Sequence, residues 1–188
     1  MGEKVNFETQ TMSEAVKILP HYTYSDYVHW EGKWEVIDGI PYAMSPAPVP
    51  RHQRISASLT TAFSNSLKGC AKCNVYQPID YLLADDIILQ PDLLITCRDI
   101  TKNFLDFPPV LVVEILSPST ALKDRHTKYS LYEGQGIKYY IIIDPAVNEA
   151  EIYLFNGKSY ELQKKAKDFN YEFTFEDCKA NVNFNEIW

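Results

Sequence analysis

Two apolar runs in the middle of the chain, each interrupted by a single carboxylate, most constrain how it can fold. Residues 87–97 contain Asp92 and residues 108–118 contain Glu114. An ionised carboxylate among buried apolar side chains is destabilising unless it is neutralised. A partner cation, a metal ion or a raised pKa can neutralise it. Two such acids on neighbouring strands favour one shared divalent cation, because carboxylate oxygens are natural ligands of Mg²⁺.

The spacing of apolar residues predicts one α/β domain over residues 1–188, with a mixed central β-sheet flanked by helices. Helical spacing marks residues 51–68 and a second stretch from Thr120 or Ala121 to about Glu133. Because this second helix joins two strands, a crossover connection makes those strands parallel. The predicted strands span residues 75–83, 87–96, 110–116 and 138–144, followed by a hairpin at residues 156–157 and short C-terminal strands.

An N-terminal helical and hairpin segment precedes this core. Residues 1–22 form an extension, within which residues 11–19 fit a short amphipathic helix. Residues 23–30 fit another helix, which begins with the sequence of a capping box. A tight hairpin turn is expected at residues 38–39, an Asp-Gly pair, and a proline-rich connector at residues 45–50.

Composition excludes some classes of protein and leaves others open. The net charge of −7 argues against a protein that coats nucleic acid by bulk attraction, although a local basic cluster can still bind phosphate. The longest apolar runs fall short of the roughly 18–20 residues needed to span a bilayer. The acidic N-terminus lacks the basic and apolar regions of a signal peptide. We therefore expect a cytoplasmic protein without a membrane segment.

The four cysteines include one close pair, Cys70 and Cys73, with two residues between them. Such a pair is typical of half a zinc site or of a redox motif. A structural zinc site needs a second pair of Cys or His ligands, and Cys97 and Cys178 stand singly in the sequence. The sequence thus favours ordinary reduced thiols, with a zinc or redox module as the alternative.

A lysine on the second helix can complete a site with the two acids. Lys128 belongs to a stripe that recurs at intervals of three and four residues and also contains Asp124 and Tyr132. Two carboxylates, a metal ion and a lysine can hydrolyse a phosphodiester. The metal lowers the pKa of a bound water, and the lysine orients that water or acts as its base.

From about Tyr24 to Trp188 the sequence resembles the restriction endonuclease domain family of the PD-(D/E)XK nuclease superfamily. The order and spacing of several short matches carry the resemblance: residues 34–39, 44–48, 51–53, 90–93 (with Pro91 and Asp92), 113–119, then Asp124, Lys128 and Tyr132, and residues 142–145.

This resemblance implies a restriction-endonuclease-like core and DNA as the substrate. It further implies Mg²⁺, with Mn²⁺ as a substitute, held by Asp92 and Glu114, with Glu35 as the upstream acid that completes the metal site. His52 is an additional catalytic candidate. The chain departs from the superfamily pattern at Leu116, where a lysine is expected two residues after Glu114. We expect Lys128 to take over the role of that missing catalytic lysine.

Each assignment has a structural alternative. Asp92 also fits a strand-end residue bound by backbone amides, and Glu114 fits an ion pair with a lysine or arginine. Lys128 also fits a solvated partner of Asp124. Three further alternatives are an exposed hairpin carboxylate for Glu35, an ordinary helix-start histidine for His52, and either solvation or phosphate contact for Arg51, Arg54, Lys123 and Arg125.

The sequence therefore predicts a Mg²⁺-dependent DNA endonuclease. The alternative function is a catalytically silent nuclease-fold protein that binds DNA or a protein partner, which the leucine at position 116 and the acidic charge favour. We also expect a homodimer, because cutting both strands of a duplex needs two sites related by a two-fold axis. The abundance of aromatic residues, which are common in interfaces, agrees with this.

Overall fold

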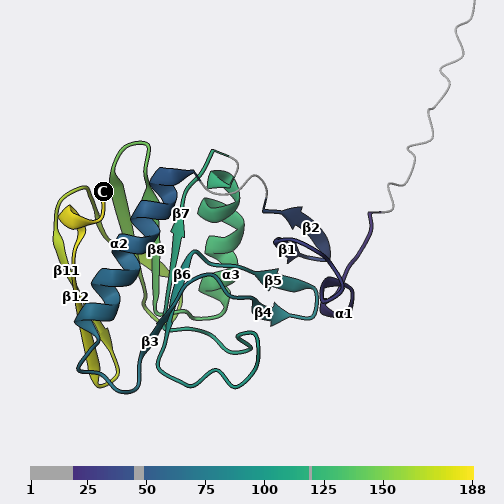
Figure 1. Ribbon diagram of the computed structural model, residues 1–188, viewed down its shortest axis with the longest axis horizontal. Coiled ribbons are helices and arrows are strands. Elements are labelled where there is room, and N and C mark those ends of the chain that lie inside the picture. Colours follow the sequence, from purple (N-terminus) through teal and green to yellow (C-terminus); the bar gives the residue numbers. More distant parts are fainter. Residues whose placement is uncertain (1–18, 45–48, 119) are drawn as a thin grey trace, which may run out of the picture.

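The computed structural model describes residues 19–44, 49–118 and 120–188 (Figure 1). The predicted helix at 11–19 lies outside these residues except for its last position. Residues 45–48 of the predicted connector and Ser119, which closes one of the matched motifs, lie outside them as well.

A six-stranded mixed sheet forms the centre of the molecule, with strand order β10-β9-β8-β7-β6-β3. Strands β7 and β8 pair in parallel, as the crossover argument predicted, and the other neighbours pair antiparallel. The strands are β3 (Asn74–Tyr76), β6 (Leu93–Thr96), β7 (Leu111–Ile115), β8 (Tyr139–Asp144), β9 (Glu149–Phe155) and β10 (Tyr160–Ala166). The predicted α/β class with a mixed central sheet is confirmed.

Alternate residues of β7 and β8 pack into two separate apolar cores, so both faces of the sheet are buried. On one face, Val113 and Ile141 join the core formed by helix α2 (Pro50–Ser66). On the other face, Val112 and Ile142 join a core that contains Tyr132. Figure 1 shows α2 and the helix that carries Tyr132 on opposite sides of the central strands.

A smaller sheet of order β2-β1-β5-β4 lies beside the second core. It contains the predicted hairpin, and Asp38 and Gly39 both have positive φ at its turn, as such a tight turn requires. The remaining hairpin, β11-β12, packs on α2, where Ser66 Oγ accepts a 2.7 Å hydrogen bond from the amide of Asn181. The elements are α1 (Tyr24–Tyr27), β1 (Trp34–Ile37), β2 (Ile40–Ala43), β4 (Tyr81–Ala84), β5 (Ile87–Leu89), β11 (Asn170–Phe175), β12 (Cys178–Asn183) and η2 (Phe184–Glu186).

The single strands predicted at 75–83 and 87–96 are wrong, because each is two strands that belong to different sheets. The first divides into β3 and β4, and the second into β5 and β6. Pro78 and Pro91 lie in the breaks and lack the N–H that a continuous ladder would use. The second break places Asp92 immediately before β6, where the chain passes from the small sheet to the large one.

The helix after β7 also differs from the prediction of one regular α-helix. A π-helical turn, η1 (Lys123–Lys128), precedes the short helix α3 (Tyr129–Gly134). Such turns are rare and occur often at functional sites. Within the described residues, no helix is long and apolar enough to cross a membrane.

The expectation of ordinary reduced thiols is wrong for this structure. Cys70 pairs with Cys178, and Cys73 pairs with Cys97, as disulfides. The two pairs are separated by 108 and 24 residues in the sequence. Only the fold brings such distant positions together, so spacing alone gave no sign of either pair.

Gly39 provides a test of the hairpin. Its φ is +74°, and an added Cβ would lie 2.2 Å from the ring of His21. We expect Gly39→Ala to lower the free energy of unfolding by about 1–3 kcal/mol, because it combines backbone strain with a steric clash. Gly134→Ala, where an added Cβ would meet no atom within 4 Å beyond its neighbours and its own helix backbone, is the matched control. Urea denaturation measures both, and equal stability of the two variants would contradict the assigned turn.

Candidate metal and phosphodiester site

The acids of the two apolar runs meet across neighbouring strands. In the antiparallel β6-β7 pair, Leu93 lies opposite Val113. Continuing this register by one residue places Asp92 opposite Glu114, and directly opposed residues have Cβ atoms about 4.5–5.5 Å apart. The amide of Ile115 donates a 2.8 Å hydrogen bond to Asp92 Oδ2, which ties Asp92 to the strand that carries Glu114.

The Lys128 ammonium lies at the centre of an acidic cluster. Its Nζ is 2.6 Å from Glu35 Oε1, 2.9 Å from Glu114 Oε1 and 3.5 Å from Asp124 Oδ1. Lys128 is only 2% exposed. Burial alone would lower the pKa of Lys128, but the surrounding carboxylates outweigh this and raise that pKa well above its usual value. The ammonium is therefore charged at neutral pH.

Glu35 reaches this cluster from β1 in the small sheet. Its Oε1 accepts a 3.0 Å hydrogen bond from the amide of Gln90, and its Oε2 contacts the ammonium of Lys123. Burial would raise the pKa of Glu35, but the charges of Lys128 and Lys123 outweigh burial and lower that pKa. Glu35 is thus a buried anion held between two lysines, and not an exposed hairpin residue.

Glu114 is in a different electrostatic state. Tyr132 Oη donates a 2.7 Å hydrogen bond to Glu114 Oε1, the oxygen that also contacts Lys128. Burial raises the pKa of Glu114 well above its usual value; Lys128 opposes this rise, and the carboxylates of Asp124 and Asp92 add to it. Additional positive charge at this point would therefore stabilise ionised Glu114.

The cluster carries more acid than base. With the lysines and carboxylates ionised and His52 neutral, two ammoniums face four carboxylates, a balance of 2 − 4 = −2: Lys123 and Lys128 against Glu35, Asp92, Glu114 and Asp124. A protonated His52 beside Asp92 would change this balance to 3 − 4 = −1. A divalent cation would neutralise this excess.

His52, near the start of α2, contacts the acidic cluster from the other face of the sheet. Its Nε2 lies 3.2 Å from Asp92 Oδ2. Burial lowers the pKa of His52, but the hydrogen bond and charge of Asp92 outweigh burial and raise that pKa. His52 therefore positions and partly neutralises Asp92.

The π-helical turn η1 explains how two lysines reach the same carboxylate. In an α-helix, residues five apart point about 140° away from each other. In a turn with i→i+5 hydrogen bonds they lie nearly above one another, so Lys123 and Lys128 can both contact Glu35. Tyr140 Oη anchors the turn by donating a 2.8 Å hydrogen bond to the carbonyl of Asp124.

The oxygen atoms of Asp92 and Glu114 fit a metal site. Asp92 uses Oδ2 for His52 and Ile115, and Glu114 uses Oε1 for Lys128 and Tyr132. Among the described residues, nothing donates a hydrogen bond to Asp92 Oδ1 or Glu114 Oε2. These oxygens and the excess negative charge suit a hard divalent cation such as Mg²⁺. Glu35 differs, because both of its oxygens already contact ammonium groups.

The structure brings together all five residues that the sequence singled out: Glu35, His52, Asp92, Glu114 and Lys128. Two further residues, Lys123 and Tyr132, reach the site although they were not among the residues predicted for it. Tyr132 follows Lys128 by four residues on the same stripe, which is a usable signal. Lys123 had no such signal, because its orientation depends on the π-helical turn.

The other basic residues considered for phosphate contact bind protein groups. Arg51 contacts Asn148, and Arg54 contacts the carbonyl of Trp188. Arg125 Nη1 lies 2.8 Å from Glu151 Oε1. Of the four cations left open by the sequence, Lys123 is the one that reaches the acidic cluster.

Comparisons with known proteins show the family and the fold of the chain. The Uma2 family model, described as "Putative restriction endonuclease", matches residues 24–175. A Synechocystis protein named "Uncharacterized protein slr1290" is 33% identical over 144 residues, which cover 72% of this chain and 75% of that protein. A crystal structure from Anabaena variabilis, titled as a "putative nuclease belonging to DUF820", has a TM-score of 0.70 at 14% identity. That match covers 88% of this chain and 97% of the other and shows a shared fold.

Replacing the central lysine tests the electrostatic account. We expect Lys128→Met to lower the free energy of unfolding by about 3–5 kcal/mol at pH 7 in EDTA, because it leaves buried carboxylates without their cation. Lys158→Met, at an exposed lysine, is the matched control. Chemical denaturation measures both; a Lys128→Met loss no larger than that of the control would contradict the charged cluster.

Glu35 and Glu114 determine how the stability of the fold, and the effect of Lys128→Met on it, should change with pH. The pKa of Glu35 is lower in the folded protein than in the unfolded chain. Ionised Glu35 therefore stabilises the fold at pH values above the pKa that it has in the unfolded chain. This stabilisation is lost as pH falls through the pKa of Glu35 in the folded protein. Glu114, with a raised pKa, destabilises the fold at neutral pH, and acid relieves this effect. Without Lys128 the stabilising contribution of Glu35 is smaller, because Lys123 is then its one remaining cation among the described residues, and the destabilising effect of Glu114 is larger. The difference in the free energy of unfolding between the parent and Lys128→Met should therefore become smaller as pH falls toward about 4.

Proposed function

The chain belongs to the Uma2 family of restriction endonuclease-like proteins, and from this membership we propose that it is a metal-dependent DNA endonuclease. The observation that carries the proposal is the buried Lys128 ammonium between Glu35 and Glu114, with Asp92 on the adjacent strand. A core of ordinary stability gains little from burying such a cluster, because removing charges from water is unfavourable. The cluster is better explained by the chemistry that it performs.

Asp92 and Glu114 would hold Mg²⁺, and Mn²⁺ would substitute for it, with Glu35 completing the acidic wall of the site. The bound ion supplies charge stabilisation at the phosphate and lowers the pKa of a water. Tyr132 fixes the orientation of Glu114 through its hydrogen bond, and His52 does the same for Asp92. These contacts keep the ligand oxygens in place.

Lys128 would replace the lysine that the superfamily pattern expects at position 116. Leu116 is buried in the apolar core that contains Tyr132 and offers neither charge nor a hydrogen-bond donor. The Lys128 ammonium instead touches the metal-binding carboxylate Glu114. From there it can orient the attacking water and stabilise the negative charge that develops on the phosphate.

The second candidate function is a catalytically silent scaffold that binds DNA or a protein. It is favoured by Leu116, an uncharged residue at the position where the superfamily pattern has a lysine. Metal affinity separates the two functions. A scaffold has no need of a cation site, whereas the nuclease requires one for each turnover.

Single substitutions should separate metal binding from chemistry. We expect Lys128→Ala to reduce Mg²⁺-dependent cleavage of plasmid DNA by about two orders of magnitude or more, the scale of losing an acid–base or electrostatic catalyst. Its Mn²⁺ affinity, measured by calorimetry, should stay near that of the parent. Asp92→Ala should instead lose the metal, and Lys158→Ala should match the parent in both measurements.

A compensating substitution sharpens this test. Leu116 lies two residues after Glu114, where the extended chain continues beyond β7. The two side chains therefore share a face of the sheet. Adding Leu116→Lys to Lys128→Ala should restore part of the lost cleavage. Parental cleavage by Lys128→Ala alone would reject the role of Lys128, and failure of the unsubstituted chain to bind Mn²⁺ would favour the scaffold.

We further propose that the active form is a homodimer. Two exposed apolar side chains adjoin the site in sequence: Val49, 63% exposed, precedes α2, and Leu122, 77% exposed, precedes η1. A second copy that covers these side chains would bury their apolar surface and present a second site to a duplex. Sedimentation should show a dimer at micromolar concentration, which Leu122→Glu weakens and Leu162→Glu, at an exposed position on β10, does not. A parent that sediments only as a monomer would refute the dimer.

A further inference from the structure

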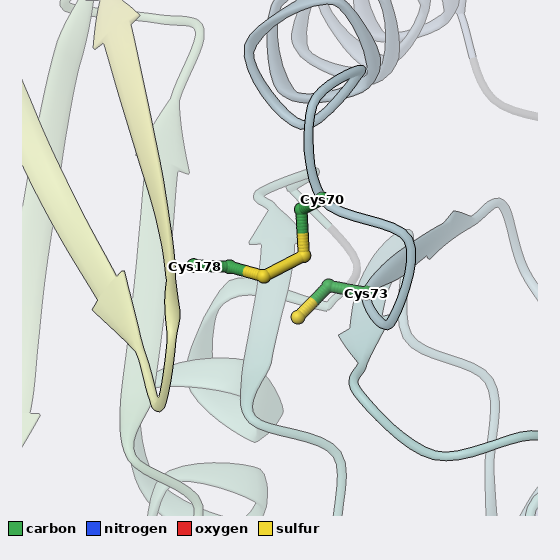
Figure 2. A group of neighbouring side chains, drawn as sticks. All are labelled: Cys70, Cys73 and Cys178. Atoms are coloured by element: carbon green, nitrogen blue, oxygen red, sulfur yellow. A yellow bond between two sulfur atoms is a disulfide. The ribbon is translucent and has the colours of Figure 1, made fainter.

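The two disulfides lie so close together that their sulfur atoms form one cluster. The Sγ atoms of Cys70, Cys73 and Cys178 all lie within 4.8 Å of one another, and Cys97 joins them through its bond to Cys73. Figure 2 shows the side chains of Cys70 and Cys73, from one loop, converging with that of Cys178, from the C-terminal hairpin. Two independent cross-links would not need to share one location, so this convergence requires its own explanation.

Each cysteine is held at the end of a regular element. Cys70 follows helix α2, and Cys73 directly precedes β3. Cys97 directly follows β6, whose Thr96 pairs with Asn74 of β3. Cys178 begins β12 and lies opposite Phe175 at the tip of the C-terminal hairpin. Regular elements thus adjoin Cys73, Cys97 and Cys178 directly, and such support favours a preorganised metal site.

We propose that, in the reduced protein, Cys70, Cys73, Cys97 and Cys178 bind a single structural Zn²⁺ ion. Tetrahedral zinc has Zn–S distances of about 2.3 Å, which set neighbouring sulfurs about 3.8 Å apart. The three mutually close sulfurs lie within the range that small side-chain movements bring to this spacing. The spacing of Cys70 and Cys73, with two residues between them, is also that of one half of a zinc knuckle.

The environment suits a closed structural site. Cys73 is 5% exposed, and the sulfur cluster adjoins the apolar core under α2. Lys72, between the first two cysteines, forms a 2.9 Å ion pair with Asp177, the residue before Cys178. This pair links the two segments that supply three of the ligands. Four thiolates around Zn²⁺ carry a net charge of 4 × (−1) + 2 = −2.

The disulfides and the zinc ion are alternative uses of the same cysteines. Reduction of both disulfides by a dithiol or phosphine takes four electrons and four protons and gives four thiols. Zinc binding then releases the four thiol protons and forms four Zn–S bonds. The Cys70–Cys178 disulfide fastens the β11-β12 hairpin to the segment after α2, and the Cys73–Cys97 disulfide joins β3 to β6. One zinc ion bound to all four cysteines would connect the same segments.

The test uses the unsubstituted chain, reduced with a phosphine and supplied with Zn²⁺ before gel filtration without oxygen. We expect about one zinc per chain by elemental mass spectrometry, and its release when an organomercurial blocks the thiols. Cobalt in place of zinc should give the thiolate charge-transfer absorption of a tetrahedral sulfur site. Thermal unfolding of the reduced chain should occur at higher temperature with zinc than without it.

Variants identify the ligands. Cys97→Ser and Cys178→Ser should each lose zinc or the parental cobalt spectrum. Asp92→Ala should keep its zinc, which shows that the ion is not at the acidic cluster. A reduced parent without zinc, or zinc that the organomercurial does not release, would overturn the site. An unchanged cobalt spectrum in Cys97→Ser would overturn the four-cysteine assignment.

Discussion

The buried ammonium of Lys128 is the interaction on which the architecture of this protein depends. A lysine removed from water is unfavourable unless anions surround it, and here three carboxylates do so from separate elements. Glu35 comes from the small sheet, Glu114 from the large sheet and Asp124 from η1. Each of these elements thus supplies part of the charge that makes the buried ammonium tolerable. The site therefore also connects the two sheets and the π-helical turn to one another.

Two local irregularities of the chain bring the residues of the acidic cluster together. The break at Pro91 ends β5 and starts β6, so a single segment supplies the Gln90 amide to Glu35 and places Asp92 beside Glu114. The π-helical turn directs Lys123 and Lys128 to the same side. A regular strand and a regular helix would each have pointed one of these groups elsewhere. Local departures from ideal geometry are thus what assemble the cluster, as is common at functional sites.

Much of the fold and of the acidic cluster could be predicted from the sequence, because burial patterns are local. Apolar runs identified the central strands, and a carboxylate inside each run identified Asp92 and Glu114. What could not be predicted depends on contacts between distant segments or on small changes in backbone geometry. The division of residues 87–96 between two sheets, the inward direction of Lys123 and the meeting of Cys178 with Cys70 are of this kind. Periodicity alone carries no information about them.

Helix α2 connects the acidic cluster to the cysteine cluster. With 17 residues it is about 25 Å long, and its first turns carry His52, which contacts Asp92. Just beyond its last turn the chain reaches Cys70, which is joined to the C-terminal hairpin. Ile55, Leu59 and Phe63 pack this helix into the core along its length. The contact of His52 with Asp92 and the cross-link of Cys70 therefore lie at opposite ends of one packed helix. The helix thus joins the acidic cluster and the cysteine cluster through a single continuous element.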